Sequence, residues 1–239
     1  NSGSGSPITV EGGVAQGGAE SLAGLVLTTL KNPNSRFIYG SNTSSADMRS
    51  MVVSYGAPEW YRTVAIYAEL GAYYGLPTWG TAGCTDAYRL DAQAAHEAHE
   101  GIVLALQCGT TLAHDVGYMA FGSLYDARFL VLCNAMIDRA KRLLAPLEVT
   151  DERLGLDTIA EAARTAMPYM AMEHTVDHFR DCLWLPPDFI NRKRIDNLES
   201  ERHITDLLGD EVARILDSHS PRPLDDEVTS WLSEYVANC

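Results

Sequence analysis

Residues 80–101, GTAGCTDAYRLDAQAAHEAHEG, place several reactive side-chain types between a strand-like run and a helix-like run. The candidates in this stretch are Cys84, Thr85, Asp86, Asp91, Gln93 and His96. A cysteine in a glycine-flanked loop just before a helix is placed for a lowered pKa and for nucleophilic attack. The same pattern also fits a turn, a capped helix and a small residue selected for close packing. Both interpretations of Cys84 stay open, and the clustering favours an active-site loop.

The histidines of the following helix raise the question of metal binding. His96, His99 and Glu100 stand at i, i+3 and i+4, which brings them to one helix face. The zinc signature HExxH needs histidines four residues apart, whereas HEAHE has them three apart. We therefore predict a solvated or hydrogen-bonding face and no directly bound metal. His96, in the first turn behind the Cys84 loop, is expected to reach a ligand, and His99 to point away.

Strand-like and helix-like segments alternate along residues 1–150, which is typical of parallel strands covered by helices. Helices are predicted over residues 12–32, 58–75, 91–108 and 123–144, and strands over 36–41, 76–83 and 110–119. Pro58 in a first turn, Gly75 after a last turn and Asp91 as a cap support these boundaries. After residue 150 the chain is mainly helical, with an irregular stretch that contains Pro168, Pro186 and Pro187.

The number of strand–helix units limits the possible architecture. A complete (β/α)8 barrel takes about 250 residues and eight strands. The sequence contains only about four strand–helix units followed by helices. The chain is therefore expected to form either a smaller open sheet or about half of a barrel.

Ligands of parallel α/β folds bind beyond the carboxyl ends of the strands, so the residues after each strand form the candidate site. The three predicted strands end in Tyr39, Gly40 and Asn42, in Cys84, Thr85 and Asp86, and in His114, Asp115 and Tyr118. We expect these ends to converge, with Cys84, His96 and His114 around one cavity. Because adjacent residues of an extended segment point in opposite directions, only one of His114 and Asp115 should face it. The EHTVDHF cluster, residues 173–179, is expected near the rim, where it caps or seals the site.

The composition excludes several classes of protein. A net charge of -14 opposes binding to nucleic acid or to an anionic membrane, which requires clustered lysine and arginine. The absence of GxGxxG and GxxxxGK sequences disfavours a nucleotide cofactor, and no GxSxG sequence is present.

The five cysteines are scattered without a CxxC pair, which favours a reducing cytoplasm. No apolar run reaches the ~20 residues of a membrane span. No signal peptide is recognisable, and a first residue other than Met suggests a piece of a longer protein.

Several of these segments together resemble one known family. They are GGVAQGGAESLAGLVLTTLKNP, FIYGS, YGAPEWYRTVAIYAELGAYYGLP, GTAGCTDAYRLDAQAAHE, AHDVGYMAFGSL and HTVDHFR. Over about residues 3–230 the chain resembles the trimethylamine methyltransferase (MttB-type) family of corrinoid-dependent methyltransferases. Members are about twice as long and form TIM (β/α)8 barrels, which implies that this chain corresponds to their C-terminal half. Residues 1–150 would then supply βα units of the barrel, and residues 151–239 a helical segment that packs on it.

The resemblance implies that a methyl group passes from a methylated amine to the Co(I) of a corrinoid carried by a partner protein. Trimethylamine enzymes of the family place pyrrolysine in the loop that here contains Cys84. The chain therefore resembles a member without pyrrolysine, and such members are associated with quaternary amines such as betaines. A quaternary ammonium already carries its charge, so a neutral amine leaves without an added electrophile.

The residues at the strand ends and the family resemblance together predict the site. Expected catalytic residues are Cys84, Asp86 and His96, and expected substrate-binding residues are Tyr39, Trp79, Gln93, His114 and Tyr118. Aromatic faces would hold a cation at about 0.5–2 kcal/mol each. Asp86 would add Coulombic attraction, and His96 would donate a hydrogen bond to a substrate carboxylate. Expected partners are the corrinoid protein, the amine, a separate N-terminal half of the barrel and further copies of the chain in a homo-oligomer.

Two departures from the family pattern bear on the substrate. Relatives often have LDDEI where residues 132–136 read LCNAM, and SK where this chain has Ala87 and Tyr88. Two alternative functions also stay open. One is a barrel that holds a small cation without transferring a methyl group. The other is a metal-dependent TIM-barrel lyase that uses His96 and His114.

Overall fold

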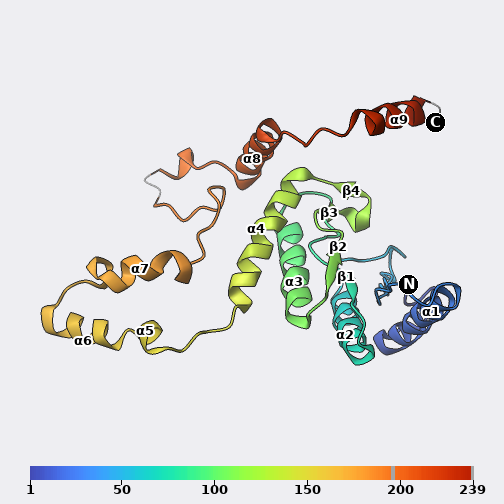
Figure 1. The fold of residues 1–239 in the computed structure, drawn as a ribbon, viewed down its shortest axis with the longest axis horizontal. Coiled ribbons are helices and arrows are strands. Elements are labelled where there is room, and N and C mark those ends of the chain that lie inside the picture. The colour runs from blue at the N-terminus through green and yellow to red at the C-terminus, as the bar shows by residue number, and fades with distance from the viewer. Residues whose placement is uncertain (195–196, 238–239) are drawn as a thin grey trace.

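The computed structural model describes residues 1–194 and 197–237. Its helices are α1 (Val10–Lys31), α2 (Pro58–Tyr74), α3 (Ala92–Cys108), α4 (Ala127–Leu144), α5 (Asp151–Leu154), α6 (Leu156–Thr165), α7 (Glu173–Cys182), α8 (Ile204–Ser218) and α9 (Asp226–Ala237). Its strands are β1 (Trp79–Thr81), β2 (Leu112–His114), β3 (Tyr118–Met119) and β4 (Leu124–Tyr125). Figure 1 shows a main body built from α1 to α4 and the strands, an arm that contains α5 to α7, and α8 and α9 beyond α4.

Local end signals set the limits of α2 and α3. Pro58 occupies the first turn of α2, and Gly75 ends that helix in the left-handed conformation at φ 67°. The Asp91 carboxylate accepts hydrogen bonds from the backbone N–H groups of Gln93 and Ala94 at the start of α3. The four helices predicted before residue 150 are confirmed, as is the helical character of the segments after it.

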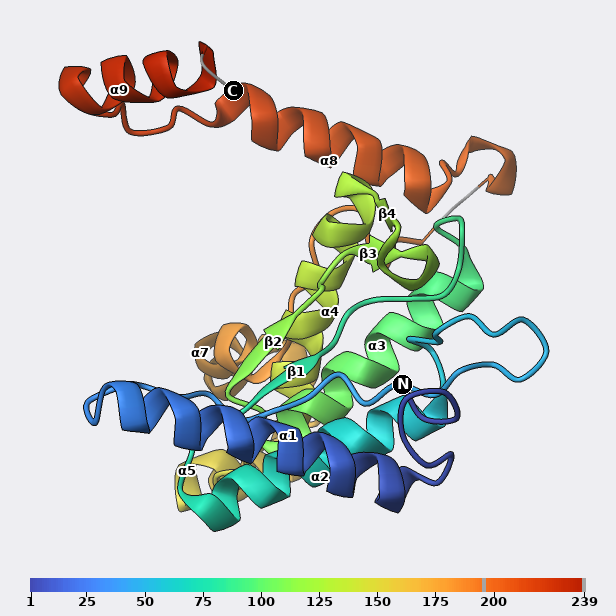
Figure 2. The same ribbon diagram turned by 90° about the vertical axis from the view of Figure 1, so that its right-hand side faces the viewer.

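Parallel pairing is confirmed, although the sheet is small. β1 and β2 pair in parallel, from Trp79 opposite Leu112 to Thr81 opposite His114. Tyr39 forms a parallel bridge with Thr78, so the predicted strand at 36–41 lies beside β1. The single strand predicted over 110–119 instead forms two strands, β2 and β3. Only β2 joins β1, whereas β3 pairs antiparallel with β4. In the described residues the strands form open two-stranded sheets and no closed barrel (Figure 2).

Helices cover one face of β1. A Cβ added to Gly80 would lie 3.0 Å from Cγ1 of Val64 in α2, so Gly80 faces the helices. Because side chains alternate along a strand, Trp79 and Thr81 point to the opposite face. On the helix side, the core contains Ala82, Ala94, Ala98, Ile102, Phe129 and Cys133 from β1's loop, α3 and α4. The sheet thus has a helix-packed face and a face that carries Trp79.

The C-terminal helices differ in how they pack. α8 joins α4 through a cluster of Leu132, Ala135, Phe189 and Leu208. In contrast, the described residues of α5, α6, α7 and α9 include no buried side chain. None of the described helices combines the length and apolar character needed to cross a bilayer.

Candidate functional site

Backbone hydrogen bonds join the loops that follow β1 and β2. The N–H of Gly117 donates to the carbonyl of Gly83 at 2.8 Å, and the N–H of Thr85 donates to the carbonyl of Tyr118 at 3.1 Å. Both glycines have positive φ, 71° at Gly83 and 89° at Gly117, which is a conformation that glycine adopts readily. The carboxyl ends of these two strands therefore converge, as the sequence predicts.

Asp86 ties the β1 loop to the segment before α2. Its carboxylate accepts hydrogen bonds from the Ser54 hydroxyl at 2.5 Å, the Tyr55 N–H at 2.7 Å and the Gly56 N–H at 3.0 Å. Three donors occupy most of the acceptor capacity of one carboxylate. In this arrangement the side chain of Asp86 positions a loop.

Glu97 holds the same loop from the other side, and it is a residue that the sequence reasoning missed. Its Oε2 atom accepts from the Thr85 hydroxyl at 2.5 Å and from the Asp86 N–H at 2.9 Å. Its Oε1 atom accepts from Nε2 of Gln93 at 2.8 Å, so Gln93 is engaged within the protein. The available signal was the i, i+4 spacing of Gln93 and Glu97 behind the Asp91 cap.

Cys84 is a buried thiol, with 2% of its surface exposed. Burial and the nearby carboxylates of Asp115 and Asp86 raise the pKa of Cys84 well above its ordinary value. Cys133 of α4 lies in the same core, where its Sγ donates to the carbonyl of Gly83 at 3.4 Å and burial raises its pKa to about 12. Cys84 is therefore a neutral thiol at physiological pH. This state favours the close-packing interpretation over the nucleophilic one.

His114 and Asp115 form a pair at the end of β2. Nδ1 of His114 lies 2.9 Å from Oδ1 of Asp115. The expectation that these neighbours point in opposite directions is wrong, because Asp115 has φ 65° and is not extended. Asp115 is also hydrogen-bonded to Tyr55, whose pKa is raised to about 12 mainly by burial and then by Asp115. Aspartate adopts this left-handed conformation more readily than most residues other than glycine.

Trp79 adds an aromatic surface beside this pair. The centroids of the Trp79 and His114 rings are 5.0 Å apart. The side chain of His114 is 41% exposed and that of Asp115 is 22% exposed. Tyr118 is 40% exposed and packs edge-on against Tyr125 of the β3–β4 hairpin. The end of β2 thus carries His114 and Asp115, and the His114 ring lies against Trp79, the first residue of β1.

Tyr39 lies in the core and not at the strand ends. It is 1% exposed and packs with Val10, Val14 and Tyr67 between α1 and α2. Gly40 occupies the opposite face, where an added Cβ would lie 2.8 Å from Nε1 of Trp79. The expected position of Tyr39 is therefore corrected, because strand alternation turns its side chain toward the helices.

His96 occupies a different surface of α3. Its side chain is 76% exposed, and Nε2 lies 3.7 Å from Oε2 of Glu100. Together with His99 it lines a groove of about 1190 Å³ between α3 and α4, near the start of α8. His99 is the more buried histidine, and burial lowers its pKa. The prediction that His96 reaches the strand ends is therefore wrong, whereas His99 also lies in the groove and away from those ends, as expected.

The position of His96 also corrects the predicted cavity. The core face of α3, which includes Ala94 and Ala98, packs under the β1 loop, whereas His96 lies on the groove side. Cys84, His96 and His114 therefore do not surround one cavity. A lyase site built from His96 and His114 loses its geometric basis for the same reason. What remains at the strand ends is negative charge beside aromatic faces, an arrangement that suits a small organic cation.

Comparison with known proteins identifies the same family along the whole chain. The family described as Trimethylamine methyltransferase (MTTB) matches residues 1–239. The chain is 30% identical over 237 residues to trimethylamine methyltransferase MttB of Desulfitobacterium hafniense (strain DSM 10664 / DCB-2), covering 98% of this chain and 47% of that protein. It is 26% identical over 231 residues to trimethylamine methyltransferase MttB of Methanosarcina thermophila, covering 95% and 47%.

A relative with a different named substrate is also similar. The chain is 25% identical over 238 residues to glycine betaine methyltransferase of Desulfitobacterium hafniense (strain Y51), covering 98% of this chain and 49% of that protein. The chain thus spans about half the length of the curated relatives it matches. Because the family match extends from the first residue to the last, this chain belongs to the trimethylamine methyltransferase family.

Proposed function

We propose that this chain supplies the C-terminal half of a TIM-barrel methyltransferase that transfers a methyl group from a methylated amine to a corrinoid. The proposal is supported by the convergence of the loops after β1 and β2, where Asp115 pairs with His114 and the His114 ring packs against Trp79 of β1. This edge is where parallel α/β enzymes bind their ligands. The relatives named as trimethylamine and glycine betaine methyltransferases support the reaction class.

The substrate we propose is a quaternary amine such as a betaine. When bound beside the site on its carrier protein, the corrinoid supplies a Co(I) nucleophile that accepts the methyl group, and the electrons of the broken C–N bond remain on nitrogen. A quaternary ammonium leaves as a neutral amine, so the protein does not need to donate a proton. The neutral Cys84 thiol at the position of pyrrolysine is compatible with such a role, because it provides no electrophile.

The side chains at the strand ends would bind and orient the cation. Asp115 would supply opposite charge, and the ring of Trp79 would supply a face for the methyl groups. Asp86 and Glu97 would act as positioning residues, because their hydrogen bonds hold the β1 loop. Holding substrate and acceptor in line is the main contribution that a protein can make to this displacement.

The proposed partners follow from the same reaction. They are the methylated amine, a corrinoid protein, the N-terminal half of the barrel and further copies of the enzyme in a homo-oligomer. The open edge of the β1–β2 sheet is where the missing strands of the barrel would pair. A cytoplasmic location belongs to the proposal, since Cys84, Cys108, Cys133 and Cys182 are all unpaired thiols.

The direct test is formation of methyl-Co(III), followed by absorption spectroscopy. A full-length protein with this chain as its C-terminal half is mixed with Co(I) corrinoid, free or protein-bound, and with trimethylamine or glycine betaine. Methylation that depends on the quaternary amine is the expected result. Binding of the amine without methylation would instead support the non-catalytic cation-binding alternative. Methylation from trimethylamine alone would overturn the substrate assignment.

A further inference from the structure

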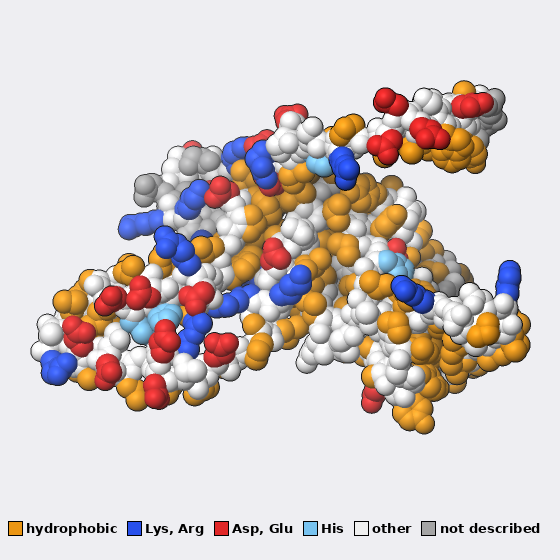
Figure 3. Space-filling view, viewed as in Figure 1, with side chains coloured by type: hydrophobic (Ala, Val, Ile, Leu, Met, Phe, Trp, Pro, Cys, Tyr) orange, Lys and Arg blue, Asp and Glu red, His pale blue; other side chains and the backbone are white. Residues whose placement is uncertain are grey.

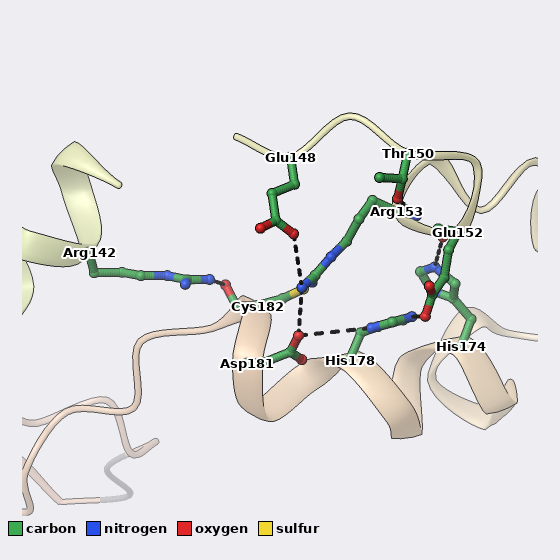
Figure 4. Close-up of polar contacts among 9 residues, drawn as sticks. All are labelled: Arg142, Glu148, Thr150, Glu152, Arg153, His174, His178, Asp181 and Cys182. Atoms are coloured by element: carbon green, nitrogen blue, oxygen red, sulfur yellow. Dashed lines mark hydrogen bonds and ion pairs between the residues drawn. The ribbon is translucent and has the colours of Figure 1, made fainter. Parts of the chain in front are cut away.

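Charged side chains of α5 and α7 pair with one another within the arm (Figure 4). The Arg153 guanidinium of α5 lies 2.9 Å from Oδ2 of Asp181, and Nε2 of His178 lies 3.5 Å from Oε1 of Glu152. Figure 1 shows α7 on this arm, apart from β1 and β2, so the expected place of EHTVDHF at the rim of the site is corrected. These contacts join α7 to α5.

The C-terminal helix α9, in contrast, is an amphipathic helix whose twelve residues are all exposed. Its apolar residues Val228, Trp231, Leu232 and Tyr235 stand at i, i+3, i+4 and i+7, so they form one stripe. The rings of Trp231 and Tyr235 are stacked 5.6 Å apart and are 60% and 58% exposed as residues. Figure 3 shows hydrophobic side chains along the lower edge of α9 and acidic ones above them. A helix of this kind needs a surface on which to bury its stripe.

A groove of suitable length and character lies between α3 and α4. Residues of α3 line it from Ala92 to Gln107, a distance of about 23 Å at 1.5 Å per residue, and α9 spans about 18 Å. Its apolar lining includes Val103, Met136 and Leu143. The groove volume of about 1190 Å³ exceeds the ~300–1,000 Å³ typical of small-molecule pockets. Amphipathic helices bind in grooves of this kind through their apolar face.

The charges of the groove and of α9 are complementary. α9 contains three acidic residues and no basic one. The acidic groups beside the groove are already engaged, because Asp91 caps α3 and Glu100 lies 3.7 Å from His96. Arg139 of α4 also lines the groove and forms no ion pair with another described residue. An acidic helix would therefore meet a positive charge there.

His99 provides a second group that lacks a partner. Its Nε2 atom is buried at the groove and has no hydrogen-bond partner among the described residues. A buried polar atom without a partner is unfavourable, and a hydroxyl can either donate to it or accept from it. Tyr235 carries a hydroxyl on the apolar stripe of α9, which is a group of the kind required.

We propose that α9 of one copy binds in the α3–α4 groove of a second copy, and that the exchange is reciprocal. Every copy carries both the helix and the groove, so two copies related by a two-fold axis satisfy each other in a closed dimer. The proposal specifies an interface for the homo-oligomer of the proposed function and does not depend on methyl transfer.

The connection between α8 and α9 favours a second copy over the groove of the same chain. α8 begins at the groove, where Ile204 lines it, and is about 22 Å long, so α9 follows its far end. Residues 219–225 contain Pro221 and Pro223, which favour an extended connection. Figures 1 and 2 show α9 beyond α8 and away from α3 and α4.

The proposed N-terminal half of the barrel is a weaker candidate for the groove. Its strands would pair with the edge of the β1–β2 sheet. The groove instead lies on a side of α3 other than the core face that contains Ala94 and Ala98. Completing the sheet would therefore leave the groove open to a second copy.

The test is sedimentation velocity of the 239-residue chain at micromolar concentration, without amine or corrinoid, so its outcome is independent of the methyl-transfer proposal. We expect the mass of two chains. Trp231→Glu in α9 and Leu143→Glu in the groove change residues that are 60% and 66% exposed, so both variants should fold. Loss of an aromatic anchor weakens a contact by at least about tenfold. Because the dimer contains the contact twice, each variant should raise Kd by about 100-fold or more.

Two variants with the same added charge are the controls. Ser230→Glu lies on the opposite face of α9, and Leu27→Glu lies on α1, where Leu27 is 68% exposed. Both should remain dimeric. Circular dichroism of each variant checks that the helices are retained.

A mixture of Trp231→Glu and Leu143→Glu separates exchange between copies from docking within one chain. The first variant supplies an intact groove and the second supplies an intact α9, so mixed dimers should form through one contact. Fluorescence energy transfer between differently labelled chains should therefore appear in the mixture and be absent from either variant alone.

Four results would overturn the proposal. A parent chain that sediments as single chains would leave α9 to its own groove or to the N-terminal half. A dimer that persists in Trp231→Glu or Leu143→Glu would form through another surface. Dissociation by Leu27→Glu would instead identify the α1 face as the interface. Absence of energy transfer in the mixture would exclude exchange of α9 between copies.

Discussion

At the residue scale, the carboxyl groups of Asp86 and Glu97 hold the loop after β1 in place. Asp86 and Glu97 each accept three hydrogen bonds, and together they fix Thr85 between the segment before α2 and helix α3. A carboxylate that satisfies buried donors stabilises its loop strongly, because a donor left unpaired retains its desolvation penalty.

Asp86→Asn should lower the free energy of unfolding by about 1–3 kcal/mol. The amide can accept through one oxygen only, and its NH2 group would face one of the donors from Ser54, Tyr55 or Gly56. Asp91→Asn makes the same chemical change at the α3 cap, where asparagine caps equally well, and should change stability little. Urea unfolding of both variants measures the difference. Equal stabilities would show that Asp86 does not hold the loop.

The buried thiols and Tyr55 predict a loss of stability at alkaline pH. The folded protein raises the pKa values of Cys133 and Tyr55 to about 12 and raises that of Cys84, so the folded state retains these protons more tightly than the unfolded chain. The contribution of these three groups to stability should be constant below about pH 8.5 and fall as the pH rises toward 12, as the unfolded thiols and then the unfolded phenol ionise. Cys84→Ser should make the decline shallower in urea unfolding measured across this range. An unchanged slope would argue against a buried neutral thiol.

At the element scale, helix ends could be predicted because their signals are local. Asp91, Pro58 and Gly75 act through the backbone of their own turns. The position of His96 could not be predicted in this way, because the face that a helix buries depends on the helices beside it. The pairing of His114 with Asp115 could not be predicted either, because the sequence does not reveal that Asp115 adopts φ 65°.

Several contacts of the candidate site likewise could not be predicted from the local sequence. Glu97 and the segment 54–56 meet around Asp86 from positions distant in sequence, and their contact depends on the packing of α2 against α3. The loops after β1 and β2 could be predicted from the sequence, whereas the tertiary structure decides which of their side chains meet.

Packing of the segment before α2 against α3 leads to a prediction at Gly56. A Cβ at Gly56 would lie 2.3 Å from Cδ of Glu97, so Gly56→Ala should displace the Glu97 carboxylate and lower stability by about 1–3 kcal/mol. Gly209 of α8 is a matched control, because a Cβ there meets no atom within 4 Å among the described residues. Gly209→Ala should be neutral or stabilising, since alanine favours helix. Thermal unfolding compares them, and a neutral Gly56→Ala would contradict the close packing.

At the scale of the whole molecule, the chain exposes apolar surface that the proposed complete barrel would bury. Figure 3 shows hydrophobic side chains gathered over α1 and α2 at the lower right. Val26, Leu27 and Leu30 of α1 are 56%, 68% and 78% exposed, and Leu112 of β2 is 51% exposed. Contiguous exposed apolar surface usually marks an interface.

Joining the chain to the N-terminal half of a family member should therefore reduce binding of the dye ANS and raise the midpoint of urea unfolding. The physical reason is burial of apolar side chains and pairing of the free sheet edge. A fusion to an unrelated domain of similar size controls for solubility. If both fusions bind as much ANS as the chain alone, the half-barrel arrangement is wrong.

The proposed location of the amine site is tested most directly by comparing two histidine variants in the methyl-transfer reaction. In the full-length protein, His114→Ala removes a ring packed against Trp79, whereas His96→Ala changes a residue of the α3–α4 groove. We expect kcat/KM for Co(I) methylation to fall about tenfold or more with His114→Ala, which corresponds to about 1.4 kcal/mol, and to stay within about twofold with His96→Ala. Equal losses, or a larger loss with His96→Ala, would contradict a substrate site at the ends of β1 and β2.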